Sequence, residues 1–191
     1  MGTAARGRAF AVGLATACAI GVAGCSADPD DQPTDATPAS PTPTDDQTEP
    51  PGNQVTEPTL PADAEGGSIR SAKAFVGYYI DLLNYAMVTG DTKSFRAAAR
   101  NCEGCDRYAD LFDRIEQAGG SARTRGWEVE EVAAAHQGSA TAVVFDVAAA
   151  AVMSKPRANA EPTHIPPAKY ELRILLAPAG SSWRAVEFTR S

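Results

Sequence analysis

The last 123 residues, from Ile69 to Ser191, predict an α+β domain in which N-terminal helices pack on one face of a four-stranded antiparallel sheet. Apolar residues at helical spacing fill the first half of this segment, and runs with the alternation of β-strands fill the second half. No helical pattern separates the predicted strands. Since parallel strands need long crossover connections, we expect the sheet to be antiparallel.

The longest predicted helix runs from Ser71, a suitable N-cap, to Gly90, a suitable stop. Its main apolar residues recur at steps of three and four, as they do along one face of a helix. They are Phe75, Tyr79, Leu82 and Ala86. We expect this face to pack on the sheet.

Two shorter helices are predicted next. Asp91 is a suitable N-cap for a helix over Thr92 to Arg100. A third helix is expected over Cys105 to Ala118, because the glycines at 119 and 120 favour its termination. Its apolar residues also keep helical spacing, and they are Tyr108, Leu111, Phe112 and Ile115.

Four segments in the second half predict strands. Trp127 to Ala135 alternates between apolar and acidic residues, and a change of phase at Glu131 predicts a β-bulge. The other three are rich in β-branched or alternating apolar residues, and they are Ala140 to Val152, Tyr170 to Ala177, and Trp183 to Thr189. Ser154 to Pro167 contains four prolines and is expected to be a polar loop.

The segment from Ser26 to Ser68 has a different composition from the rest of the chain. It contains nine of the 14 prolines, ten acidic residues and no basic residue. Such a segment cannot bury enough apolar surface to offset the entropy lost on ordering. It is therefore predicted to be a disordered tether, which with the preceding cysteine covers residues 25–68.

The net charge of −7 comes from this tether, because the segment from Ile69 onward has 15 basic and 14 acidic residues. A nucleic-acid-binding domain would carry a clearly basic face. The nearly neutral balance therefore argues against a nucleic-acid partner.

The first 24 residues have the features of an export signal. Arg6 and Arg8 precede an apolar run of 14 residues, Ala9 to Val22, which is too short to span a membrane. The sequence Val22-Ala23-Gly24-Cys25 resembles the lipobox of bacterial lipoproteins. This resemblance implies that Cys25 is lipid-modified and anchors the protein on the extracytoplasmic face of the cell membrane. The alternative is an ordinary signal peptide.

Three stretches of the folded segment form a recognisable set: the run from Ala74 to Ala86, the turn Thr89-Gly90-Asp91 and the Cys102-x-x-Cys105 motif. Together they resemble an uncharacterised family of actinobacterial lipoproteins. The final strand, with Trp183 to Val186, is similar to that of nuclear-transport-factor-2-like (SnoaL-like) domains. The resemblance implies a curved sheet wrapped by helices into a cone, often with an apolar pocket. That cone serves isomerases, dehydratases and binding modules alike.

Cys102 and Cys105 are the two cysteines of the folded segment. Outside the cytoplasm, two thiols at this spacing are expected to form a local disulfide. A redox-active pair is an alternative, although thioredoxin-like motifs follow a βαβ pattern rather than a helix. Zinc binding is disfavoured because a second such pair is absent and neither His136 nor His164 has ligand spacing with it.

Five residues are candidates for the lining of a cone pocket. Asp146 lies in an apolar strand and would act as a base if it faced inward, and His136 ends the preceding strand. Tyr78, Asp81 and Tyr85 lie on one side of the first helix and could line a pocket mouth. The alternatives without a functional role are an Asp146 that faces outward, a solvated His136 and tyrosines that pack in the core.

These observations favour a lipid-anchored envelope protein whose domain binds a small ligand or another envelope protein. No nucleotide, metal-protease or hydrolase motif is present in the sequence, so neither a cofactor nor a metal is expected. Two alternatives remain open. One is an isomerase- or dehydratase-like enzyme that uses the cone pocket with Asp146 or His136 as base. The other is a thiol-disulfide oxidoreductase that uses Cys102 and Cys105.

Overall fold

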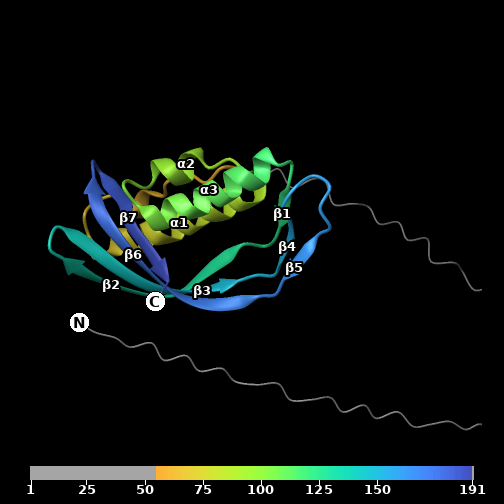
Figure 1. The fold of residues 1–191 in the computed structure, drawn as a ribbon. Helices are drawn as coiled ribbons and strands as arrows, with labels where there is room; N and C mark the ends of the chain where they lie inside the picture. Colours follow the sequence, from red (N-terminus) through yellow and green to blue (C-terminus); the bar gives the residue numbers. More distant parts are fainter. Residues whose placement is uncertain (1–54, 191) are drawn as a thin grey trace, which may run out of the picture. The chain divides into compact units, whose positions relative to one another are not determined.

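The computed structural model of the chain describes residues 55–190 (Figure 1). The predicted export signal, the lipidation site Cys25 and the tether up to residue 54 lie outside the described residues. Among the described residues, no helix combines the length and apolar character needed to cross a membrane.

The longest helix, α1 (Ile69–Thr89), begins and ends with well-formed caps. Its N-cap is Ser68 rather than Ser71. The Ser68 hydroxyl accepts from the Ser71 amide at 3.1 Å, and the Ser71 hydroxyl accepts from the Ser68 amide at 3.1 Å. This reciprocal capping box satisfies two amides that the helix itself leaves unpaired. Gly90 ends the helix with a left-handed φ of 77°, as predicted.

The second helix, α2 (Lys93–Ala97), is shorter than predicted. The chain leaves the helix there because its backbone pairs with strand β7 (Ser182–Arg190) instead. The Arg100 amide donates to the Ala185 carbonyl at 2.8 Å, and the Ala185 amide donates to the Ala98 carbonyl at 3.0 Å. The third helix, α3 (Glu103–Gln117), follows with Cys102 as its N-cap.

A four-stranded antiparallel sheet forms the main layer of the domain. Its strands lie in the order β2-β3-β6-β7, and they are β2 (Trp127–Gln137), β3 (Ala140–Ala149), β6 (Ala168–Ala179) and β7. The register of β2 shifts between Val129 and Val132, where the bulge was predicted. The helices lie over the concave face of this curved sheet (Figure 1). The predicted α+β fold is therefore confirmed.

The core fills the space between α1 and the concave face. Tyr79, Phe95 and Phe188 form its aromatic centre, since the ring of Tyr79 lies 4.9 Å from that of Phe95 and 5.8 Å from that of Phe188. Inward side chains of the middle strands β3 and β6 complete this core.

A second sheet, not predicted, contains β1 (Ser121–Arg123), β4 (Val152–Lys155) and β5 (Thr163–Ile165) in the order β1-β4-β5. The predicted strand from Ala140 to Val152 breaks after Ala149, and its continuation joins this sheet. The Pro-rich segment was predicted to be a loop because its side chains are polar. Its backbone nevertheless finds antiparallel partners, as in the pairing of Met153 with His164.

The folded unit also begins earlier than Ile69. Ala64 lies in the short 3-10 helix η1 (Ala62–Ala64) and is fully buried, and Leu60 packs against the core. The Gly66 amide donates to the Ser181 carbonyl, and the Ser182 hydroxyl donates to the Ala64 carbonyl. The tether prediction is wrong for residues 55–68, because a few backbone contacts and one small buried residue hold this segment.

Candidate functional site

An apolar cavity of about 250 Å³ lies between α1, α3 and the small sheet. Its lining comes from two helices and six strands, together with the turns that join them. The α1 and α3 members are Leu83, Met87, Val88, Thr89, Gly90, Tyr108, Leu111, Phe112, Ile115 and Glu116. The members from the strands and their turns are Gly120, Ser121, Ala122, Trp127, Ala149, Ala150, Val152, Ser154, Ile165, Pro166 and Tyr170.

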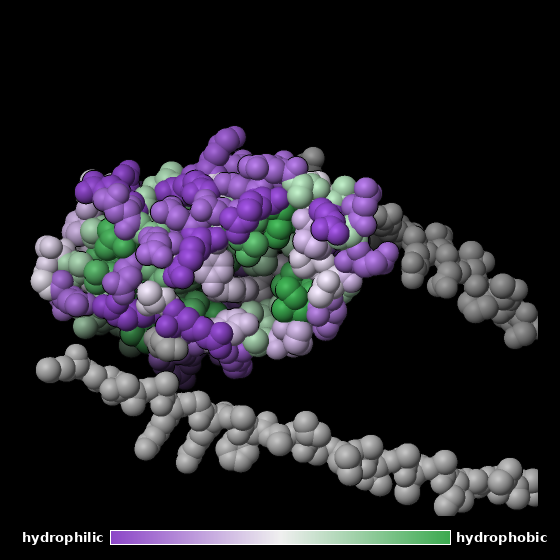
Figure 2. All heavy atoms as spheres, viewed as in Figure 1, coloured by the Kyte–Doolittle hydropathy of each residue, from purple (hydrophilic) through white to green (hydrophobic). Residues whose placement is uncertain are grey.

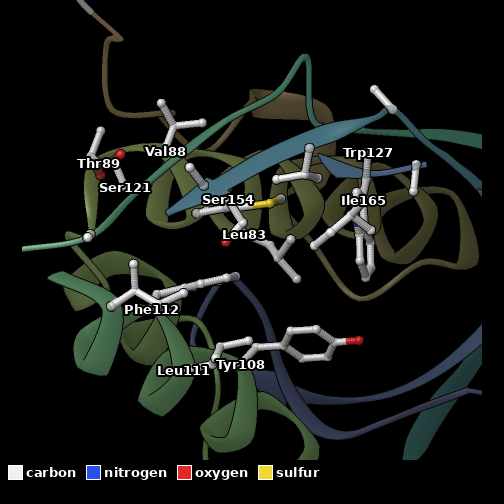
Figure 3. Close-up of a pocket in the computed structure, with 18 of the residues that line it drawn as sticks. Leu83, Val88, Thr89, Tyr108, Leu111, Phe112, Ser121, Trp127, Ser154 and Ile165 are labelled. Carbon is white, nitrogen blue, oxygen red and sulfur yellow. The ribbon is translucent and has the colours of Figure 1, made fainter. Parts of the chain in front are cut away.

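The two walls of the cavity face each other in Figure 3. Tyr108, Leu111 and Phe112 project from α3 on one side, and Trp127, Ser154 and Ile165 lie opposite. Leu111 and Ile165 are 42% and 47% exposed, so large apolar side chains reach the surface here. Figure 2 shows hydrophobic side chains on both sides of a hollow between α3 and the small sheet. The cavity is therefore open to solvent at an apolar mouth.

Few polar groups reach the cavity. Among the described residues, Glu116 is the only charged member of the lining, and its side chain packs against Gly90 at the end of α1. The Tyr108 phenol has a pKa raised above its ordinary value, chiefly by burial and also by the neighbouring Tyr170. Tyr108 therefore stays protonated at neutral pH and can donate a hydrogen bond. Such a lining suits an uncharged apolar group, because burying an unpaired charge is costly.

Asn84 fixes the position of Trp127 in the cavity wall. The Trp127 amide donates to Asn84 Oδ1 at 2.8 Å, and Asn84 Nδ2 donates to the Trp127 carbonyl at 2.9 Å. Gly126 precedes Trp127 with a φ of 88°, and any Cβ there would lie 2.7 Å from the Asn84 side chain. The glycine is thus required both by its conformation and by the close approach of Asn84.

Aromatic side chains around Trp127 make this wall rigid. The ring of Tyr108 lies 5.8 Å from that of Trp127 in an edge-on arrangement, and 5.6 Å from that of Phe188. The ring of Tyr170 lies 5.9 Å from that of Trp127. Aromatic pairs at these distances add to the stabilisation from burial alone.

A second depression of about 360 Å³ adjoins the cavity and shares Tyr108 and Leu111 with it. It lies between the start of α3 and the end of β7. Its two charged residues are Arg107 and Arg190, and both are exposed. The guanidinium of Arg190 stacks on Tyr170, 4.3 Å from the ring centre.

The five residues predicted to line a pocket do not line this cavity. Asp146 lies on the outer face of β3, between the buried Phe145 and Val147, so the inward orientation is wrong. His136 is exposed at the end of β2, where its Nδ1 lies 3.2 Å from the Thr141 hydroxyl. An enzyme that uses either residue as the base of this cavity is therefore not supported.

The three candidates on α1 lie on other faces of the helix. Asp81 and Tyr85 line a separate surface depression beside Arg125, where partial burial raises the pKa of Asp81. Tyr78 is half-buried and packs edge-on against Phe75. Its pKa is raised by burial and by the nearby Glu57 carboxylate. Asp81 and Tyr85 therefore share a surface depression, but none of the three residues lines the apolar cavity.

Cys102 and Cys105 lie at disulfide-bonding distance, with their sulfur atoms 1.98 Å apart. The Cys105 amide donates to Cys102 Sγ, so the pair also caps α3. Both cysteines are almost completely buried. This environment is unlike that of a reactive, accessible thiol.

The metal prediction concerns the same cysteines and the two histidines. Within residues 55–190, no group of three or more histidine, cysteine, aspartate and glutamate side chains is placed to hold a metal ion. His164 is exposed in β5.

The sequence prediction treated the residues of the cavity wall as ordinary core positions. Tyr108, Leu111 and Phe112 have the spacing of a buried helix face, and Trp127 starts a strand. Their spacing does not distinguish a filled core from a hollow one. Gly104, within the Cys102-x-x-Cys105 motif, was assigned no role from the sequence. A Cβ at Gly104 would lie 1.8 Å from the Phe188 carbonyl oxygen, so this glycine lets α3 pack directly on β7.

A protein-family model matches residues 44–152, which are more than half of the chain. Its description is a family of unknown function, DUF6318. The chain belongs to this family. The DUF6318 match begins before Ile69, in agreement with the packing of residues 55–68. No curated protein matches the sequence.

Solved structures similar to this DUF6318 member have low sequence identity to it. The intermembrane space region of the chloroplast protein ARC6 is 12% identical with a TM-score of 0.50, and the match covers 65% of this chain and 96% of that chain. A nuclear transport factor 2-like protein from Salmonella enterica is 13% identical with a TM-score of 0.43, covering 65% and 92%. The likeness to the ARC6 region extends to fold alone.

Proposed function

We propose that this DUF6318 member is a lipid-anchored protein of the cell envelope whose domain binds a small, mainly apolar ligand in the cavity between α1, α3 and the small sheet. The cavity is the observation that carries this proposal. It is concave and apolar, it opens at an apolar mouth, and it offers the few hydrogen-bonding groups that orient a ligand.

The absence of acid–base partners in the lining favours binding over catalysis. Glu116 is the one ionisable carboxylate among the lining residues, and it packs on Gly90 at the rim. General acid–base catalysis needs a positioned group within reach of the substrate. The Tyr108 phenol, with its raised pKa, is better suited to donate a hydrogen bond than to abstract a proton.

The anchor is proposed from the lipobox-like sequence at Cys25. A diacyl anchor holds a protein at a membrane without any apolar segment of the folded domain. We expect native mass spectrometry of the full chain, extracted gently from its own membrane, to show acylation at Cys25 and a retained small molecule. A Cys25→Ala chain that stays in the membrane fraction would contradict the anchor.

Ligand binding can be tested on the chain without residues 1–25. Because the described core lies between residues 60 and 188, this shorter chain keeps every core contact. The neutral apolar dye N-phenyl-1-naphthylamine should bind with enhanced fluorescence, since it leaves water for an apolar site.

Two adjacent alanines of β3 provide a matched pair of variants. Ala149 lines the cavity, whereas Ala148 lies on the outer face of the same strand. Ala149→Phe should fill part of the cavity and weaken dye binding by about tenfold or more, while Ala148→Phe should leave it unchanged. Equal dye affinities in the two variants, at matched melting temperatures, would show that the dye binds elsewhere and would refute the proposal.

A further inference from the structure

The depression beside the apolar cavity differs from it in charge. Among the residues that the structure describes, Arg107 and Arg190 are the charged members of its lining, and no carboxylate lines it. Among the described residues, neither arginine has a carboxylate within ion-pair distance. By contrast, Arg96 contacts Asp110 and Asp113 at 2.7 and 2.6 Å. Within residues 55–190, two guanidinium groups without an ion-pair partner therefore lie next to an apolar cavity.

The two hollows are joined by shared side chains. Tyr108 and Leu111 line both, so the depression begins where the apolar wall of α3 ends. Arg190 lies over the ring of Tyr170, and Tyr170 itself lines the cavity. This stacking holds the guanidinium at the border between the two hollows.

Gly104 makes this arrangement possible. It lies in the lining of the depression and allows the first turn of α3 to approach the Phe188 carbonyl. Arg107 is one turn further along α3, and Arg190 is two residues beyond Phe188 on β7. The close packing of α3 on β7 thus brings the two arginines to one depression.

We propose that the ligand is an amphipathic anion, with its apolar part in the cavity and a carboxylate or phosphate head group between Arg107 and Arg190. This inference rests on the proposed function and specifies its ligand class. Guanidinium groups bind carboxylates and phosphates through paired, charge-assisted hydrogen bonds. An apolar chain fits the adjoining cavity, where the lining would disfavour a second charge.

Three single-chain probes with the same ten-carbon tail test the head group. Decanol, decanoate and decyl phosphate would compete with N-phenyl-1-naphthylamine for the chain without residues 1–25, at pH 7.5 and below micelle formation. We expect at least one anion to displace the dye at about tenfold lower concentration than decanol. The better of the two anions identifies the head group as carboxylate or phosphate.

Variants then assign this preference to the arginines. Arg107→Gln with Arg190→Gln should remove the preference for the anion, so that the anion and decanol displace the dye at similar concentrations. The single variant Arg190→Gln should reduce the preference for the anion. It keeps the test usable if the double variant is unstable. Arg184→Gln is the control, because Arg184 is exposed on the same strand and lines neither hollow.

The outcomes separate the two proposals. Displacement of the dye by all three probes at equal concentrations, or an anion preference that survives in the double variant, would overturn the amphipathic-anion inference and leave the apolar ligand site intact. Failure of the dye itself to bind would overturn the proposed function and this inference together.

Discussion

The side chain of Asn84 holds the backbone of Trp127 through two hydrogen bonds, one to its amide and one to its carbonyl. These two hydrogen bonds link α1 to the first residue of β2. They occupy the amide and carbonyl that a neighbouring strand would otherwise pair with. Because Trp127 lines the cavity, a residue on α1 that does not itself line it controls the shape of the cavity wall.

Replacing Asn84 by alanine should weaken both stability and binding. The change leaves two half-buried backbone groups of Trp127 without these partners, which costs about 1–3 kcal/mol of unfolding free energy. Urea denaturation measures this loss, and N-phenyl-1-naphthylamine titration measures the effect on the cavity. Lys93→Ala is the control, because the Lys93 side chain is 90% exposed. Equal stability of Asn84→Ala and Lys93→Ala would show that the pair does not hold Trp127.

Replacing Gly104 and Gly77 by alanine should change the free energy of unfolding in opposite directions. At Gly104 a Cβ would lie 1.8 Å from the Phe188 carbonyl oxygen, so α3 and β7 must move apart. We expect Gly104→Ala to lower the free energy of unfolding by about 1–3 kcal/mol or more. At Gly77, inside α1, a Cβ would meet nothing within 4 Å. Gly77→Ala should therefore raise stability by about 0.5–1 kcal/mol.

Thermal and urea unfolding of the two glycine variants provide the measurement. Each variant serves as the control for the other, since both introduce the same methyl group in a helix. A Gly104→Ala protein as stable as the parent would mean that α3 does not approach β7 as closely as the structure places it.

The predicted fold was correct where local patterns determine it, and incomplete where tertiary contacts do. Helical spacing identified α1 and α3, and alternation identified β2, β3, β6 and β7. The small sheet was missed because the pairing of Met153 with His164 depends on backbone partners from distant segments rather than on apolar side chains. α2 was predicted too long for the same reason, since residues 98–100 pair with Ala185.

The candidate site was harder to predict than the fold. Asp146 and His136 were chosen for their chemistry. Alternation places Asp146 on the outer face of β3, and His136 lies at the opposite end of β2 from Trp127. The side chains that do form it, Tyr108 and Trp127 among them, look like core residues in the sequence. Whether an apolar helix face is covered or left hollow depends on the size of the side chains opposite, here the small Ala149 and Ala150. Spacing along one segment does not contain that information.

The ion pair between Arg96 and Asp113 should make stability depend on pH in the acid range. Hydrogen bonds from Arg96 and then from Thr92 lower the pKa of Asp113 below its ordinary 3.8. A lowered carboxyl pKa contributes stability that is present above the ordinary value and is lost as the pH falls through the folded-state value. Asp113→Asn should therefore destabilise the protein at pH 7, and the difference from the parent should shrink as the pH falls below 3.8.

Urea unfolding across this pH range tests the role of Asp113. Asp91→Asn is the matched control, because Asp91 lies 3.9 Å from Lys93 and an asparagine keeps the oxygen that accepts from the Lys93 amide. A constant difference between Asp113→Asn and the parent from pH 7 to pH 3 would show that the charge of Asp113 is not the cause.

The disulfide between Cys102 and Cys105 should behave as a structural link rather than a redox centre. Both residues are at most 2% exposed, so a reductant can reach the sulfur atoms only when the start of α3 opens. We expect dithiothreitol to reduce the native protein slowly and the urea-unfolded protein rapidly, as measured by alkylation of the released thiols and mass spectrometry. Replacing both cysteines by serine should lower the free energy of unfolding by about 2 kcal/mol, because the bond closes only a short loop in the unfolded chain.

The native protein should also fail to accelerate the reduction of insulin by dithiothreitol. Acceleration that is lost in Cys105→Ser would instead identify an accessible redox pair and contradict the structural role.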